Sequence, residues 1–68
     1  MAQGTVTWFD VDKGYGFVAS DEGGDVYVHY SQIVTDGPRA LSAGQRVEFE
    51  VSQGQRGPQA DQLRILPT

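Results

Sequence analysis

The segment KGYGFV, at residues 13–18, places two aromatic rings on alternate positions with a glycine beside each ring. Side chains of a β-strand point alternately to its two faces, so Tyr15 and Phe17 share one face while Val18 takes the other. Alternation of this kind recurs along the chain, and no window carries apolar residues at helical spacing, which indicates an all-β protein. Either the rings or the valines must line the core, and the other set then forms the outer surface.

Short alternating segments separated by turn residues define the expected architecture. We predict antiparallel strands at about residues 3–10, 15–20, 25–30, 47–52 and 59–66, with a long loop at 31–45 that holds one helical turn near 31–33. Three strands, a long connection and two further strands suit a small closed barrel, because closure removes the exposed strand edges of an open sheet. The whole chain, residues 1–68, is expected to be a single domain.

The composition excludes several classes of binding site. The 68 residues contain five Lys and Arg against nine Asp and Glu, for a net charge of -4, so bulk positive charge does not explain any binding of polyanions. The chain has no cysteine, which excludes disulfides and thiolate zinc sites. We expect no metal or other cofactor, no small-molecule substrate and no membrane partner. The absence of a targeting or membrane-spanning segment leads us to expect a cytoplasmic protein, and we also expect a monomer.

The aromatic residues are concentrated in the first half of the chain, with six of the seven between Trp8 and Tyr30. In a generic β-protein these rings would be the core. Here eight Val, two Ile and three Leu supply enough aliphatic bulk for a small barrel, and burial of Lys13 or His29 on the ring face would be costly. We therefore predict that the rings face outward, over a core of in-phase valines: Val6, Val18, Val26, Val28, Val47 and Val51.

The motifs GTVTWFDVDKGYGFV and DVYVHY, with GPQA near the end, resemble the bacterial cold-shock domain along almost the whole chain. KGYGFV is similar to the first RNA-binding motif of that family, K-G-F-G-F-I/V, and VYVHY is similar to the second, V-F-V-H-F. The resemblance implies a five-stranded barrel of the oligonucleotide/oligosaccharide-binding (OB) type. It also implies binding of single-stranded RNA and DNA without enzymatic activity, as a nucleic-acid chaperone acting in cold adaptation and in regulation of transcription or translation.

Site residues follow from the resemblance, position by position. The central stacking rings are Tyr15, Phe17 and Tyr27, and the platform is extended by Trp8, Phe9, His29 and Tyr30. Lys13 and Arg56 are the cations that contact phosphates. Asp25 accepts a hydrogen bond from a base edge. Simple alternation puts Trp8 in phase with Val6, and Tyr30 in phase with Val28, so the outward direction of these two rings has to be tested.

The chain departs from the family pattern at several positions. Thr7 replaces a basic residue, Asp10 replaces asparagine, and Pro38 replaces an aromatic ring in the long loop, so we expect weaker binding than in a typical member. Three stacking phenylalanines are tyrosines here, which keeps the π-face.

Two other functions remain open from the residues alone. An enzyme could use His29 and Asp25 as an acid–base pair, although no nucleophile motif accompanies them. A peptide-binding barrel could use the same aromatic face.

Overall fold

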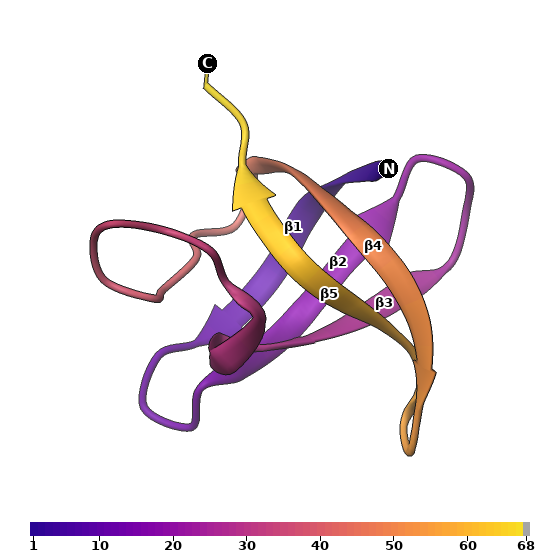
Figure 1. Ribbon diagram of the computed structural model, residues 1–68, viewed down its shortest axis with the longest axis horizontal. Coiled ribbons are helices and arrows are strands. Elements are labelled where there is room, and N and C mark those ends of the chain that lie inside the picture. Colours follow the sequence, from indigo (N-terminus) through magenta and orange to yellow (C-terminus); the bar gives the residue numbers. More distant parts are fainter. Residues whose placement is uncertain (68) are drawn as a thin grey trace.

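A computed structural model describes residues 1–67, in which five strands and one short 3-10 helix follow one another along the chain (Figure 1). The first three strands form a meander, the helix and a long loop follow, and the last two strands form a hairpin. These elements are β1 (Ala2–Asp10), β2 (Tyr15–Ser20), β3 (Asp25–His29), η1 (Tyr30–Gln32), β4 (Arg46–Gly54) and β5 (Gly57–Ile65). The predicted strands and the helical turn are confirmed, with bounds that shift by a few residues.

The strands close into a barrel in the order β1-β2-β3-β5-β4, and β1 pairs with β4 to complete the ring. The expectation that every pair is antiparallel is wrong at one seam, where β3 pairs in parallel with β5 at Tyr27 and Gln59. Five strands cannot alternate in direction around a closed ring, so at least one neighbouring pair has to be parallel. The closed five-stranded barrel itself is confirmed.

The core is aliphatic with a single buried ring. Val18, Val28, Val47, Phe49 and Leu63 have no exposed surface. The other buried members are Val6, Val26, Ile33, Leu41 and Ala60. Five of the six valines predicted for the core are therefore buried, and the rings of the KGYGFV segment are not needed to fill it.

Val51 is the exception, because 49% of its surface is exposed. The β4–β5 register shifts between Glu48 and Glu50, next to Gln62, whose φ of 50° lies in the left-handed region. Along β4 the pairing with β1 ends at Phe49, so beyond it β4 is paired on one side only, and the tip of the β4–β5 hairpin projects from the barrel (Figure 1). Alternation correctly placed Val47 inside, but it does not reveal where a strand leaves the barrel, so the assignment of Val51 to the core was wrong.

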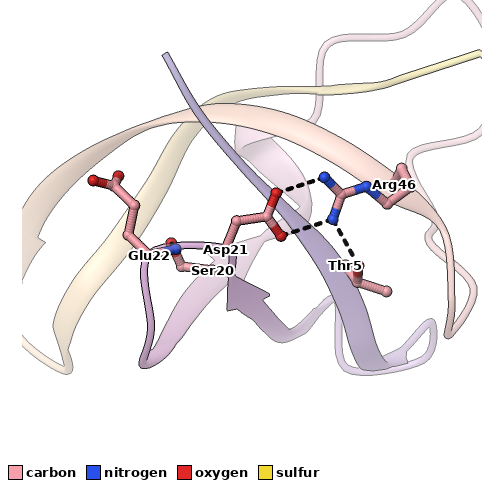
Figure 2. A network of polar contacts seen from close by, with 5 residues as sticks. All are labelled: Thr5, Ser20, Asp21, Glu22 and Arg46. Carbon is pink, nitrogen blue, oxygen red and sulfur yellow. Dashed lines mark hydrogen bonds and ion pairs between the residues drawn. The ribbon is translucent and has the colours of Figure 1, made fainter.

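An ion pair and a further hydrogen bond join three segments of the chain beside β1 (Figure 2). The guanidinium of Arg46 donates to both carboxylate oxygens of Asp21, at 2.8 and 2.6 Å, and its Nη1 also donates to the hydroxyl of Thr5 at 2.9 Å. Hydrogen bonds from Arg46 hold the pKa of Asp21 below its ordinary value of 3.8. The start of β4 is thereby fixed to β1 and to the β2–β3 turn.

Candidate nucleic-acid interface

Four aromatic rings contact one another on the outside of the barrel, and we call these residues, Trp8, Tyr15, Phe17 and Tyr27, the aromatic surface. Ring centroids are 5.5 Å apart for Trp8 and Tyr15, and 5.6 Å apart for Trp8 and Phe17. They are 5.9 Å apart for Tyr15 and Tyr27, and 5.8 Å apart for Phe17 and Tyr27. Each ring therefore touches two others, and strands β1, β2 and β3 jointly hold the set.

Strand alternation explains the direction of three of these rings. On β2, Gly16 and Val18 are buried while Tyr15 and Phe17 are only half-buried. On β3, the residues on both sides of Tyr27 are buried valines, and Tyr27 lies opposite Phe17 in the antiparallel register. The prediction that aliphatic residues fill the interior and leave these rings outside is confirmed.

Trp8 faces outward because β1 contains a bulge. Val6 lies opposite Val18, but Trp8, two residues later, lies opposite Phe17, so the register has shifted by one residue at Thr7. An extra residue in one strand reverses the alternation beyond it. Trp8 is 42% exposed as a result.

The same bulge sends Phe9 to the other side of β1. Phe9 lies opposite the buried Gly16 and packs against the core cluster. Its ring is therefore not among those of the aromatic surface, in contrast to the position that the family pattern suggested.

The glycines of KGYGFV permit close packing beneath the rings. A Cβ on Gly16 would lie 2.7 Å from the Cα of Phe9 and closer still to the carbonyl oxygen of Trp8. Gly14 has a φ of 79°, and a Cβ there would lie 2.7 Å from the ring of Tyr30. Gly16 is thus required because the backbone of β1 packs against it, and Gly14 because the Tyr30 ring does.

His29 and Tyr30 form a second pair of rings where β3 ends. The strand was expected to continue to Tyr30, but it ends at His29, and Tyr30 begins η1. This change of backbone conformation leaves Tyr30 45% exposed. The two ring centroids are 4.6 Å apart, and His29 lies opposite Tyr15 in the β2–β3 register, which places it beside the aromatic surface.

Charged groups lie at the margins. The guanidinium carbon of Arg56, in the β4–β5 turn, lies 5.1 Å from the centroid of Tyr27 and 5.8 Å from that of Tyr15. Lys13 is exposed in the β1–β2 turn. Asp25 is exposed at the start of β3, on the same side of the strand as Tyr27 and His29.

Of the three departures from the family pattern, Thr7 and Pro38 are exposed, and Asp10 is the last residue of β1. Thr7 is at the bulge and exposed. Oδ1 of Asp10 accepts the backbone N–H groups of Asp12 and Lys13, both at 3.0 Å, so its carboxylate organises the β1–β2 turn. Pro38 lies in the exposed loop before β4.

Two polar residues at this site were not predicted from the sequence. Gln59 pairs with Tyr27, its amide donates to Asp61 at 3.1 Å, and its Oε1 occupies the space that a Cβ on Gly54 would need. Ser31 contacts the imidazole of His29. Gln59 could not be predicted, because only the fold brings it next to β3. Ser31 could have been predicted, because it is two residues from His29 in the sequence.

The acid–base pair considered from the sequence is not assembled. Asp25 and His29 lie four residues apart on β3, or about 13 Å at the usual rise of a strand. Within residues 1–67, no group of three His, Asp or Glu side chains is placed to hold a metal ion. None of the helices in this part of the chain is long and apolar enough to cross a membrane.

Comparisons with known proteins identify the relatives of this chain. The family model described as 'Cold-shock' DNA-binding domain matches residues 2–66. The major cold shock protein of Streptococcus pyogenes serotype M18 is 55% identical over 66 residues, which covers 97% of this chain and 98% of the relative. The cold shock-like protein of Thermotoga maritima is 52% identical over 64 residues, covering 94% and 97%. The cold shock protein of Arthrobacter globiformis is 56% identical over 67 residues, covering 97% and 100%.

A solved structure supports the same assignment at the level of the fold. The structure titled drosophila Unr CSD456 superposes with a TM-score of 0.81 at 27% sequence identity and covers 97% of this chain. This chain spans 26% of the length of that protein. Since the family model matches residues 2–66 and the relatives align over almost their whole length, the chain belongs to the cold-shock domain family.

Proposed function

We propose that the protein binds single-stranded RNA and DNA by stacking bases on the aromatic surface. The single observation that carries this proposal is the mutual contact of four rings outside a barrel whose core is complete without them. Single strands are recognised by stacking of unpaired bases on aromatic side chains. The matching family model, described as a DNA-binding domain, supports the same class of ligand.

The proposed site extends from the aromatic surface to its neighbours. His29 and Tyr30 would continue the row of rings, and Lys13 and Arg56 would meet phosphates. Asp25 would accept a hydrogen bond from a base edge. Phe9, which packs on the core, would contribute by supporting the strand that carries Trp8.

Stacking is expected to supply most of the binding energy. Each stacked base contributes about 1–3 kcal/mol by alanine substitution, so four bases give roughly 4–12 kcal/mol before the cost of ordering the strand is subtracted. If Lys13, Arg39 and Arg56 neutralise about three phosphates, log K should fall with log salt with a slope of about -2. A binder that depends mainly on rings tolerates the net charge of -4.

A protein of this kind would act as a passive nucleic-acid chaperone. Paired bases stack on one another, so a duplex cannot offer its base faces to Tyr15 or Phe17 without unpairing. By binding the unpaired state, the protein would shift weak hairpins toward single strands through mass action, with no catalytic step. That activity would suit cold adaptation and the regulation of transcription or translation, where stable RNA structure is an obstacle.

Fluorescence of Trp8, the single tryptophan, provides the test. Addition of an oligo-dT heptamer should quench the emission in a saturable manner, because a base stacked on the indole quenches it. A duplex of the same length should give a much smaller change. Unchanged emission at micromolar single strand would contradict the proposal and would favour a protein partner for the aromatic surface.

A further inference from the structure

The imidazole of His29 is held by its neighbour Ser31. The backbone N–H of Ser31 donates to Nδ1 of His29 at 3.3 Å, which makes His29 the N-cap of η1. The hydroxyl oxygen of Ser31 lies 2.8 Å from the same nitrogen. Two groups of one residue thus converge on a single ring nitrogen.

These contacts favour the neutral tautomer that carries its hydrogen on Nε2. A backbone N–H donates only, so Nδ1 has to present its lone pair, and the hydroxyl of Ser31 then donates as well. A neutral imidazole with an accepting Nδ1 carries its hydrogen on Nε2. His29 is therefore set as a donor through Nε2–H.

The donor is exposed next to the proposed binding surface. Within residues 1–67 the hydrogen bonds of the imidazole all involve Nδ1, and no buried side-chain nitrogen or oxygen there lacks a partner. Nε2 is consequently at the surface. His29 lies opposite Tyr15 and its ring centroid is 4.6 Å from that of Tyr30, so the donor is at the edge of the row of rings.

We propose that His29 binds the nucleic-acid strand through a hydrogen bond from Nε2–H to an oxygen acceptor, and that Ser31 is the positioning residue that fixes the donor. This inference rests on the proposed function. It goes further because stacking requires only the face of a ring, which phenylalanine would provide equally well, whereas a hydrogen bond requires the nitrogen. The acceptor is a base carbonyl oxygen or a phosphate oxygen of the strand.

Substitutions at position 29 separate stacking from hydrogen bonding. His29→Phe keeps a ring and removes the donor, so we expect affinity for oligo-dT to fall about three- to tenfold, the range for loss of one hydrogen bond. His29→Gln keeps an N–H donor but loses the ring, so it should bind more tightly than His29→Ala, which loses both. Affinity of His29→Phe equal to that of the unmodified protein would overturn the inference while leaving the proposed function intact.

Substitutions at position 31 test the positioning role. Ser31→Ala should lower affinity by a smaller factor, about two- to fivefold, because the backbone N–H still reaches Nδ1. Ser31→Thr keeps the hydroxyl and should retain most of the affinity. Ser42→Ala, in the loop before β4, is the matched control and should leave binding unchanged. Equal affinities for Ser31→Ala and Ser42→Ala would overturn the positioning role.

Nitrogen NMR gives a readout that a purely structural role would not change. His29 is the single histidine, so the ¹⁵N signals of a labelled sample belong to it alone. In the neutral imidazole the shifts should report a protonated Nε2 and a bare Nδ1. Oligo-dT should then slow the exchange of the Nε2 proton and move its resonance downfield. A protonated Nδ1 in the free protein would overturn the inference.

Modified strands identify the acceptor. Thymidines replaced one at a time by 4-thiothymidine or 2-thiothymidine weaken a carbonyl acceptor, and single methylphosphonate linkages remove a phosphate oxygen. One of these changes should weaken binding of the unmodified protein and have no effect on His29→Phe. If every substitution affects both proteins equally, the hydrogen bond does not exist. Absence of any binding by the unmodified protein would instead overturn the proposed function and this inference together.

Discussion

Trp8 lies opposite Phe17 across the β1–β2 pair, with ring centroids 5.6 Å apart, although Val6 on the same strand points into the core. A regular strand cannot place residues two apart on opposite faces. The bulge at Thr7 makes this possible, since it inserts one residue between the part of β1 that fills the barrel and the part that carries the indole. One strand thereby contributes to both the core and the aromatic surface.

Because Phe17 points outward, we predict that its substitution weakens nucleic-acid binding with little effect on the free energy of unfolding. Phe17→Ala should cost about 1–3 kcal/mol of binding free energy, because it removes one stacking ring from the aromatic surface. Its effect on the free energy of unfolding should be small, since the ring is only half-buried. Titration of Trp8 fluorescence with oligo-dT and urea denaturation measure the two quantities.

Phe49 is the matched control, because its ring has no exposed surface. Phe49→Ala should lower the free energy of unfolding by about 3–5 kcal/mol through the cavity that it leaves. In a chain of 68 residues such a loss can abolish folding, so Phe49→Leu serves as the milder variant. If Phe17→Ala were as destabilising as the Phe49 variants, Phe17 would be a core residue and the prediction for Phe17 would be disproved.

Gly16 should tolerate no side chain. A Cβ at this position would approach the Cα of Phe9 to 2.7 Å and press on the carbonyl of Trp8. Backbone atoms cannot rotate away as a flexible side chain does, so we expect Gly16→Ala to cost about 1–3 kcal/mol of stability. Binding should weaken too, because β1 carries Trp8. Thermal denaturation followed by near-ultraviolet circular dichroism would measure both the stability and the environment of the indole.

Gly37→Ala is the corresponding control. No atom lies within 4 Å of a Cβ built on Gly37, in the exposed loop before β4. Its melting temperature should match that of the unmodified protein within about 2–4 °C. A Gly16→Ala protein that is as stable as Gly37→Ala would show that the β1–β2 spacing adjusts at no cost.

Alternation predicted the barrel and the direction of most side chains, because burial is periodic wherever a strand pairs regularly on both sides. It failed at irregular positions. The bulge at Thr7 and the end of β3 at His29 have no local signature, since both depend on the strand that lies alongside. Val51 was assigned to the core because the sequence does not show where β4 leaves the barrel.

The candidate site was predicted to the extent that it follows the two motifs. Tyr15, Phe17 and Tyr27 alternate on single strands, so their common face is readable from local sequence. Gln59 lies next to Tyr27 because β3 and β5 pair in parallel, and these segments are more than thirty positions apart in the sequence. Such contacts can be predicted only when the order of the strands in the barrel is known, and alternation of apolar and polar residues does not reveal that order.

The Arg46–Asp21 ion pair predicts a dependence of stability on pH. Its hydrogen bonds lower the pKa of Asp21 in the folded protein below the ordinary value of 3.8. A carboxyl whose folded pKa is depressed stabilises the fold above its unfolded pKa, and this stabilisation is lost as the pH falls through the folded pKa. Asp21→Asn should therefore melt at a lower temperature than the unmodified protein near neutral pH, and the difference should disappear in strong acid.

Both side chains of this pair are substantially exposed, at 41% for Arg46 and 50% for Asp21, so salt should also reduce the difference. Asp36→Asn, in the exposed loop before β4, provides the control for removal of one negative charge. Melting temperatures of the three proteins across the acidic range form the measurement. A difference for Asp21→Asn that persists at the lowest pH would mean that the asparagine acts through packing and not through lost charge.

Arg56 is expected to contribute to binding mainly through charge, although it contacts two rings of the aromatic surface in the free protein. Its guanidinium lies 5.1 Å from the centroid of Tyr27, so a stacked base has to lie beside it or displace it toward the phosphates. Replacing one phosphate-neutralising cation lowers the magnitude of the slope of log K on log salt by about 0.7 for a single strand. Arg56→Gln should therefore reduce the expected slope from about -2 to about -1.3 in titrations between about 50 and 200 mM salt.

Arg64 offers a control with the same change of charge. It lies five positions along β5 from Gln59, the partner of Tyr27, and pairs with Glu48 on the opposite strand. Arg64→Gln should leave the slope unchanged, because it changes the net charge of the protein without removing a phosphate contact. Equal slopes for the two variants would mean that the strand responds to the overall charge of the protein. A reduced slope for Arg56→Gln alone would assign the phosphate contact to the β4–β5 turn.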